Sequence, residues 1–405
     1  MTDVSVLEAL LYGEAIGTLT RISGDRTIFS FNETYIADDN RPTLGLRFKD
    51  EVGGLITEFR VYQTRVMPFF SNLLPEERLR KYLAQRAGVN PQREFFLLWV
   101  LGSDLPGAIT VRPPDREAWP PDTTADEFRN DEKRARALRF SLAGVQLKFS
   151  AIEGPGGGLT IPVTGVGGSW IVKLPSEKYD GVPENEYSMM TLARLIGIDV
   201  PAIELIDVRE IGNLPDEVTS LKGPALAIER FDRLSDGSAV HTEDFAQVFD
   251  LYPEQKYDKA SSLNIASVLA AEGGEEDIRE FVRRLTFNTL IGNADMHVKN
   301  WSLIYPDRRN ARLAPAYDLL STIPYLPDNK AALTFSRTKR FDRFSEDELT
   351  HLASRAHLSE TLVLNTARET VTLFHEAWQK EKDNLPLNAA VVEAVEKHLR
   401  TVPIA

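Results

Sequence analysis

The chain has 405 residues, a formal net charge of −13 and no cysteine. The length predicts two or three domains. The acidic balance argues against strong nucleic-acid binding by this chain alone, because phosphate contacts need clustered Lys and Arg. The lack of cysteine excludes disulfides, thiolate catalysis and Cys-ligated zinc. The start of the chain does not have the pattern of a signal peptide, and the strongest apolar run, Phe95–Leu101, is too short to span a membrane. We therefore expect a soluble cytoplasmic protein.

Residues 1 to about 60 have the pattern of β-strands. Ala15–Leu19 and Thr27–Phe31 carry β-branched and aromatic residues between turn residues. Pro68–Glu77 predicts the opening of a helix, and Glu94–Leu101 predicts a second, buried helix. Together these segments indicate a small α+β subdomain. Residues 103 to about 140 follow as a connector, because two proline pairs interrupt them.

A basic cluster and a loop with small residues follow. The cluster, between residues 129 and 139, is most simply a solvated helix face, and contact with a phosphate or a partner is the alternative. Ser141 and Gly144 would let a ligand approach the backbone closely, and Lys148 adds a positive charge. The segment Phe140–Ser150 is therefore either a loop that holds phosphates or a plain hairpin.

Ser169–Pro175 predicts an apolar strand that contains a lysine, Lys173. A lysine there must be exposed at a sheet edge or paired with a charge. Kinase folds place such a lysine on the α- and β-phosphates of ATP and hold it with a helix glutamate. Glu186, in the helix predicted from Glu184 to Ile196, can take that role. The alternatives are a surface lysine and a glutamate that favours a helix N-terminus.

Pro224–Arg233 predicts another strand, at the point where a kinase fold passes from one lobe to the other. The backbone of Glu229 to Phe231 would then meet the edge of adenine. His241–Gln247 predicts the start of a helix, with Thr242 as its cap. The chain that follows is predicted to be mostly helical up to about residue 400.

The helix with an apolar stripe at residues 278, 281, 282 and 285 leads into Gly292–Asn300. A predicted hairpin then brings Asp318 back beside Asn300. In a kinase fold, Asp295 would orient the attacking hydroxyl, and Asn300 and Asp318 would hold Mg²⁺ on ATP. Asp295 as a turn residue and His297 as a core histidine are the alternatives.

The order of these segments predicts a kinase, although each has a simpler explanation alone. A phosphate loop, a strand lysine, a helix glutamate, an inter-lobe strand, Asp-x₄-Asn and a second Asp follow one another as one ATP site requires. We predict an α+β, two-lobed protein-kinase-like fold with three parts. These are an N-terminal subdomain over residues 1–105, a small lobe over 106–235 and a helical C-terminal lobe over 236–405.

The acceptor stays open at this level. Asp-x-His-x-x-Asn also resembles small-molecule phosphotransferases of the aminoglycoside and choline type. The spacing therefore predicts the class of reaction and leaves a protein or a small molecule as acceptor.

The motifs as a set resemble the HipA family of bacterial serine/threonine kinase toxins over nearly the whole chain. The resemblance rests on Ser141–Lys148, Ile171–Pro175, Glu184–Tyr187, Ile228–Arg233, His241–Gln247, Gly292–Asn300 and Tyr317–Ser321, with Phe69–Pro75 in the N-terminal subdomain.

This resemblance implies a role for each matching residue. Asp295 would be the catalytic base, Lys173 would bind ATP phosphates, and Asn300 and Asp318 would be the Mg²⁺ ligands. Ser141 would be the serine that the enzyme phosphorylates on itself, which inactivates it. The remaining nucleotide-site residues would be the loop residues Gly144, Gln146 and Lys148, the adenine-binding Glu229 and Phe231, and Gln247, His297 and Tyr317.

The resemblance also implies partners. The usual one is a HipB-type helix-turn-helix antitoxin, which supplies most of the DNA contact when the pair represses its own operon. Some members phosphorylate an aminoacyl-tRNA synthetase and so promote persistence. A small-molecule phosphotransferase and a non-catalytic corepressor scaffold remain as alternative functions.

Overall fold

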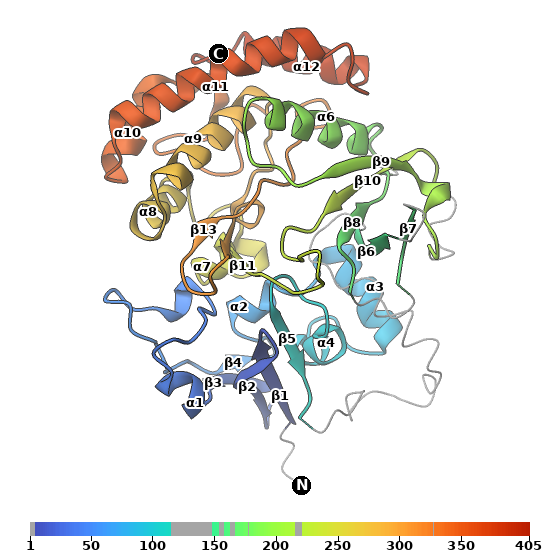
Figure 1. The fold of residues 1–405 in the computed structure, drawn as a ribbon, viewed down its shortest axis with the longest axis vertical. Coiled ribbons are helices and arrows are strands. Elements are labelled where there is room, and N and C mark those ends of the chain that lie inside the picture. The colour runs from blue at the N-terminus through green and yellow to red at the C-terminus, as the bar shows by residue number, and fades with distance from the viewer. Residues whose placement is uncertain are drawn as a thin grey trace.

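The computed structural model describes residues 5–114, 148–153, 158–162, 167–176, 178–214, 221–326 and 328–405. Three sheets lie in this part of the chain, and the neighbouring strands within each sheet are antiparallel. Figure 1 shows the first sheet at one end of the molecule, the helices α10, α11 and α12 at the other, and the second sheet beside the region between them. None of the described helices is long and apolar enough to cross a membrane.

The first sheet has the strand order β4-β3-β2-β1-β5 and belongs to the N-terminal subdomain. Its apolar face packs on short helices, and aromatic rings fill the contact. Phe29 lies 5.0 Å from Phe70, and Phe48 lies 5.0 Å from Phe69, between ring centroids. The elements are β1 (Ser5–Leu11), β2 (Glu14–Ile22), β3 (Arg26–Phe31), β4 (Tyr62–Gln63), β5 (Ile109–Arg112), α1 (Glu33–Ala37), α2 (Pro68–Ser71), α3 (Glu77–Ala87) and α4 (Glu94–Leu101).

The prediction that residues 103 to about 140 form a connector is wrong for the strand β5 (Ile109–Arg112). Strand β5 pairs with β1, from Glu8 opposite Arg112 to Leu11 opposite Ile109. Ile109 and Val111 point into the core, and both are almost completely buried. This alternation lasts only four residues beside a proline pair, so a period-two pattern is hard to recognise there. The basic cluster between residues 129 and 139 lies outside the described residues.

The second sheet has the order β7-β6-β8-β10-β9 and separates two apolar clusters. In β10, Ala225 and Ala227 belong to the cluster shared with the N-terminal subdomain, whereas Leu226 and Ile228 belong to that of the helical lobe. Side chains of a strand alternate between two faces, so this central strand is buried on both. The elements are β6 (Lys148–Glu153), β7 (Leu159–Thr160), β8 (Trp170–Lys173), β9 (Ile203–Asp207), β10 (Pro224–Glu229) and the helix α6 (Val182–Leu195).

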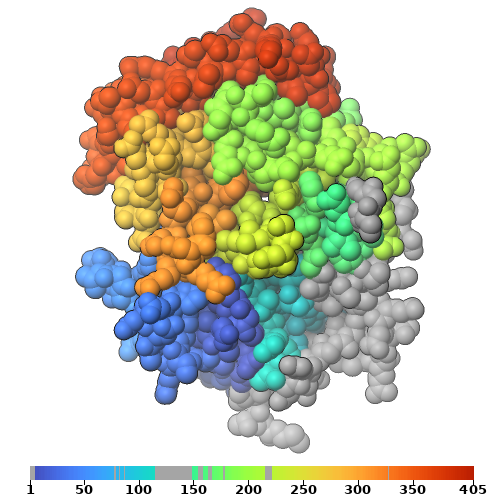
Figure 2. Space-filling view, in the orientation of Figure 1, coloured from blue at the N-terminus to red at the C-terminus, as the bar shows by residue number. Residues whose placement is uncertain are grey.

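The C-terminal lobe is helical around a small third sheet of order β11-β12-β13. Figure 2 shows the N-terminal subdomain against this sheet. At this contact, the backbone N–H of Thr43 donates to the Arg308 carbonyl at 2.8 Å. The elements are β11 (His241–Asp244), α7 (Phe245–Val248), α8 (Ser262–Glu272), α9 (Glu275–Leu290), β12 (Ser302–Tyr305), β13 (Arg312–Leu313), α10 (Glu346–Arg355), α11 (Glu360–Glu381) and α12 (Ala389–Leu399). The predicted hairpin and the C-terminal helices are confirmed.

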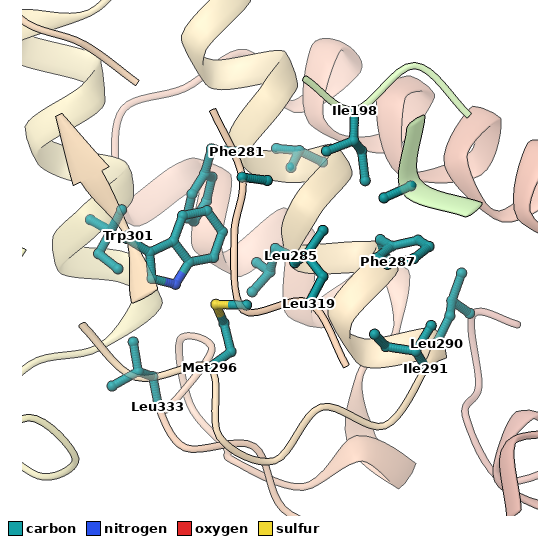
Figure 3. Close-up of a cluster of buried hydrophobic side chains, with 14 of the residues drawn as sticks. Ile198, Phe281, Leu285, Phe287, Leu290, Ile291, Met296, Trp301, Leu319 and Leu333 are labelled. Carbon is teal, nitrogen blue, oxygen red and sulfur yellow. The ribbon is translucent and has the colours of Figure 1, made fainter. Parts of the chain in front are cut away.

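Helix α9 supports the segment with the predicted catalytic motif. Its stripe places Phe281 and Leu285 in the core with Met296, which lies inside that motif, and Trp301, which directly follows it (Figure 3). The helix ends before Gly292, whose φ of 66° is left-handed, and a Cβ there would meet Ile323 at 2.7 Å. Only glycine fits this position easily, and it turns the chain out of the helix toward Asp295.

The predicted helix from His241 is partly wrong. His241–Asp244 forms the strand β11, in which Thr242 lies opposite Ile304, and the helix α7 begins at Phe245. The cap is therefore Asp244, whose carboxylate accepts from the Gln247 N–H at 2.9 Å. Polar residues suited to a cap lie at both positions, and the pairing with β12, distant in sequence, decides between them.

Glu243 is consequently buried between the lobe and the N-terminal subdomain. Its Oε1 accepts from the Leu46 N–H at 2.8 Å and from the Tyr305 hydroxyl. Its Oε2 has no hydrogen-bond partner among the described residues. Burial raises the pKa of Glu243 to about 8, although these two donors act in the opposite direction.

Glu243 should make stability fall with rising pH. Its folded-state pKa lies above the unfolded value, so the folded chain holds the extra proton between about pH 4.5 and pH 8. The contribution is fully present below this window and is lost as pH rises through it, by about 1.4 kcal/mol for each pH unit inside the window. Urea unfolding at pH 5 and pH 8.5 measures this, and Glu243→Gln, which cannot ionise, should lose less stability. Equal losses in both proteins would contradict the assignment.

Candidate active site

Three charged groups from distant elements meet at one point. The Lys173 ammonium, on β8, donates to Glu186 Oε1, on α6, and to Asp318 Oδ1 after the β12–β13 hairpin. Lys173 and Glu186 are both buried, with side-chain exposures of 4% and 3%. The structure therefore gives Lys173 the paired environment that its apolar strand requires, and the edge-strand alternative is wrong.

A second lysine faces the same carboxylate. Lys148 on β6 lies directly opposite Lys173 on β8, and its Nζ is 3.8 Å from Asp318 Oδ2. Like charges directly opposite each other destabilise a sheet unless anions compensate them. Here Glu186 and Asp318 are those anions, so two ammonium groups and two carboxylates form a charge-balanced cluster.

The pKa shifts follow from this arrangement. Burial would raise the pKa of Asp318, but the ammonium groups of Lys148 and Lys173 hold it well below its ordinary value. Burial would lower the pKa of Lys173, but Asp318 and Glu186 raise it. Asp318 and Lys173 are thus both ionised near neutral pH. Burial lowers the pKa of Lys148.

The loop after Gly292 is tied to Asp318 through one buried amide. Asn293 Nδ2 donates to the Asp318 carbonyl at 3.1 Å, and Asn293 Oδ1 accepts from the Asp295 N–H at 3.1 Å. The Thr322 hydroxyl accepts from the Ala294 N–H at 2.7 Å. Asp318 has a φ of 54°, a left-handed conformation that costs energy in a residue other than glycine. The surrounding hydrogen bonds hold it there.

Asp295 and Asn300 lie at the two ends of this loop and are linked. Asn300 Nδ2 donates to the Asp295 carbonyl at 2.9 Å, which uses the nitrogen of the amide, whereas Mg²⁺ prefers the oxygen. Asp295 Oδ1 accepts from the Tyr257 hydroxyl at 2.8 Å. Burial raises the pKa of Asp295, and the Tyr257 hydrogen bond opposes this rise. Asp295 is therefore positioned to receive a proton from a hydroxyl.

His297 is a neutral, buried histidine beside these groups. Burial, with the nearby charge of Lys256, lowers its pKa to about 3. Its ring lies edge-on to that of Tyr257, at 5.1 Å between centroids. Its Nδ1 has no hydrogen-bond partner within the described residues. Such a buried orphan atom fits a site that awaits a polar ligand.

The segment between the lobes contributes Phe231, whose ring stacks on Tyr317 at 5.9 Å and 26°. This contact brings the predicted adenine segment next to Asp318. The Glu229 N–H donates to Ala202, within the sheet region, so it is already used. The predicted adenine contact would therefore use other backbone groups of Glu229–Phe231, and it stays a prediction.

Of the other residues predicted to bind the nucleotide, one contacts the N-terminal subdomain, and three lie outside the residues that the structure describes. The Gln247 amide donates to the Phe69 carbonyl at 3.1 Å and accepts from the Asp244 N–H at 2.8 Å, so it links α7 to the N-terminal subdomain. A role for this side chain at the nucleotide stays a prediction. Ser141, Gly144 and Gln146 lie outside the described residues.

A metal ion in this site would depend on the nucleotide. The described residues hold no cluster of three or more His, Asp or Glu side chains that could bind a metal alone. Asn300 and Asp318 supply one amide and one carboxylate. Mg²⁺ is commonly bound by one or two such groups with substrate phosphates and water. The residues present therefore fit Mg²⁺ on ATP.

Sequence reasoning missed Tyr257 and the buried charges of Glu76 and Lys256. Tyr257 lies 38 positions before Asp295, and nothing in its surroundings distinguishes it from a surface tyrosine. Glu76 did lie in a segment that the sequence analysis named, because Pro68–Glu77 was predicted to open a helix. No local pattern connected that segment to the site.

Two family models match the chain. The HipA N-terminal domain matches residues 7–112, and the HipA-like C-terminal domain matches residues 140–378, which is more than half of the chain. The chain belongs to the HipA family. The resemblance inferred from the motifs is thus confirmed.

Relatives agree with this membership. "Putative kinase Y4dM" of Sinorhizobium fredii is 59% identical over 407 residues, which cover 100% of this chain and 98% of that protein. "Putative kinase Y4mE" of the same organism is 34% identical and covers 83% of this chain and 82% of its own length. The serine/threonine-protein kinase toxin HipA of Shewanella oneidensis is 26% identical over 69% of this chain and 68% of its own length.

A solved structure confirms the fold of this HipA-family chain. The Shewanella oneidensis complex of HipA, HipB and operator DNA contains a chain with a TM-score of 0.73 and 22% identity. The match covers 98% of this chain and 95% of that one. The predicted α+β, two-lobed protein-kinase-like fold with an additional N-terminal subdomain is therefore confirmed.

Proposed function

We propose that this chain is an ATP-dependent serine/threonine-protein kinase that acts as the toxin of a HipBA-type toxin–antitoxin pair. One observation carries the proposal. The Asp318 carboxylate is held by the lysines of two adjacent strands, and Asn293 ties its backbone to the loop that bears Asp295 and Asn300. An array of cations, a base and oxygen ligands is what phosphoryl transfer needs.

The residues divide the work as follows. Lys173 and Lys148 bind the phosphates, whose charge replaces the Asp318 carboxylate as partner of the lysines. Asn300 and Asp318 would hold Mg²⁺, which would supply positive charge to the phosphate oxygens. The backbone beside Phe231 receives adenine, and the neutral ring of His297 lies within the nucleotide site. The chain mainly positions the reacting groups.

Asp295 takes the proton of the acceptor. The acceptor oxygen bonds to the γ-phosphorus, its proton passes to the Asp295 carboxylate, and ADP leaves with the electrons of the broken P–O bond. The Tyr257 hydroxyl makes the hydrogen bond to Oδ1 that an acceptor hydroxyl would make, at 2.8 Å. An acceptor serine would displace it.

The family and its relatives support the remaining parts of the proposal. The partner would be a HipB-type helix-turn-helix antitoxin, with DNA contact mainly through that partner. The Shewanella oneidensis structure contains HipA, HipB and operator DNA together. The acidity of this chain agrees with that division. The substrate would be a cytoplasmic protein, with an aminoacyl-tRNA synthetase as first candidate. The predicted domain boundary near residue 235 is kept, whereas the one near residue 105 would move beyond β5, which pairs with β1 of the N-terminal sheet.

Incubation with radiolabelled ATP and cell lysate tests the proposal against its alternatives. A labelled protein band that depends on the chain supports a protein kinase. Label found only in small molecules would indicate a small-molecule phosphotransferase. No label in either fraction, with operator binding retained in the presence of the antitoxin, would indicate a corepressor scaffold.

Ser141 should carry phosphate in protein made in cells. Phosphorylation adds a charge of roughly −1.5 to −2, which beside the ATP phosphates would repel the nucleotide. We expect partial modification in the wild type, weak MgATP binding by the modified fraction, and none of the modification in Asp295→Asn. Intact-mass spectrometry with peptide mapping measures this. An unmodified Ser141 in an active wild type would show that the chain does not inactivate itself there.

A further inference from the structure

The N-terminal subdomain reaches the loop that bears the proposed base. Lys299, the residue before Asn300, is buried and belongs to the catalytic loop. Its ammonium donates to the carbonyl and to Oδ1 of Asn72, at 3.1 Å and 3.0 Å. It also pairs with Glu76 Oε1 at 3.1 Å and with Asp244 Oδ2 at 3.4 Å. Two of these three partner residues lie in the N-terminal subdomain.

Glu76 holds the loop a second time through its other oxygen. Glu76 Oε2 accepts from the Lys256 ammonium at 2.9 Å. The Lys256 carbonyl accepts from the Val298 N–H at 3.5 Å. The next residue, Tyr257, donates to Asp295. One buried carboxylate is thus connected to the loop through Lys299 and to the proposed base through Lys256 and Tyr257.

The charges of this network balance. Glu76 and Asp244 face Lys256 and Lys299, all with side chains at most 13% exposed. Burial would raise the pKa of Glu76, but Lys299 and Lys256 lower it to about 2. A balanced set of buried charges is stable as a whole and becomes costly when one member is removed.

We infer that Glu76, with Asn72, is a positioning residue for phosphoryl transfer, supplied to the catalytic loop by the N-terminal subdomain. The inference rests on the proposed function, because it assumes that Asp295 and Asn300 react with acceptor and metal. It also gives a role to Glu76 in the Pro68–Glu77 segment, which the sequence analysis interpreted only as the opening of a helix. Glu76 acts through Lys299 and Lys256 and touches neither ATP nor acceptor.

Glu76→Gln in the full chain tests the inference. The neutral amide leaves Lys299 and Lys256 with one carboxylate too few, so the loop should shift. A displacement of about 1 Å can cost on the order of 100-fold in rate, and we expect kcat to fall by that factor. The KM for ATP should change by a smaller factor than kcat, because Lys173 and Phe231 lie on other elements than the shifted loop.

Glu94→Gln is the matched control. Glu94 is a fully buried carboxylate of the same subdomain, paired with Arg80 at 2.9 Å and Arg65 at 3.3 Å. The loss of the Glu94 carboxylate should destabilise the subdomain about as much as Glu76→Gln does. The folded Glu94→Gln protein should nevertheless keep the wild-type kcat. Glu76→Asp, which retains the charge, should recover part of the rate. Glu76→Gln combined with Lys299→Met should cost less than the product of the single effects, since both break one contact.

A readout without catalysis separates this inference from the proposed function. Amide hydrogen exchange of residues 295–300 should be about tenfold faster in Glu76→Gln than in Glu94→Gln. That result supports the inference even if the wild type transfers no phosphate, which would contradict the proposed function alone. Unchanged exchange and kcat in a folded Glu76→Gln protein would overturn the inference. Equal losses of kcat in Glu76→Gln and Glu94→Gln would also overturn it.

Discussion

Asp295→Asn should lower phosphoryl transfer by on the order of 10²–10⁴-fold, the usual contribution of a general base. The amide cannot take the acceptor proton. Its oxygen can still accept from Tyr257, and the backbone bonds to Asn293 and Asn300 do not involve the side chain. The variant should therefore fold normally and bind MgATP as the wild type does.

Asp307→Asn is a suitable control for this variant. Asp307 is an exposed aspartate in the β12–β13 turn, where its carboxylate accepts from the backbone of Arg309 and Asn310. Initial rates of label transfer from radiolabelled ATP, with melting curves for all three proteins, measure the effect. A folded Asp295→Asn protein within about threefold of the wild-type rate would exclude Asp295 as the base.

The convergence of Lys173, Glu186 and Asp318 could be predicted from the sequence, because each is marked by its local context. A lysine inside an apolar strand needs a partner, and a glutamate at the start of the next helix is the nearest candidate. The spacing from Asp295 to Asn300, followed by a predicted hairpin, predicted that these two residues and Asp318 belong to the same site. The family model, relatives and fold agree with this order.

The parts that sequence reasoning missed depend on contacts between distant segments. Lys299 and Asn72 are 227 positions apart, and the pattern around Lys299 is that of any polar loop. Thr242 and Asp244 are equally suited to begin a helix, and the ladder to Ser302–Tyr305 decides that β11 comes first. Propensity cannot rank such alternatives, because tertiary pairing outweighs the small local differences.

Lys173→Met should nearly abolish the stabilisation that MgATP gives to the folded chain. A ligand that binds only the native state adds about 2.7 kcal/mol of stability at 100 times its Kd. Without the Lys173 ammonium the phosphates lose their most buried charge partner, so the rise in melting temperature should disappear and kcat/KM should fall by on the order of 10²–10³-fold.

The same change leaves the buried Glu186 carboxylate without its cation, which can cost about 3–5 kcal/mol. The double variant Lys173→Met/Glu186→Gln removes both charges, so it should regain much of this stability while MgATP still gives no shift. Calorimetry of the wild type and both variants, with and without MgATP, separates the two effects. Because stability and nucleotide binding change independently in this design, a normal MgATP shift in either variant would mean that Lys173 serves the lobe structure and not the phosphates.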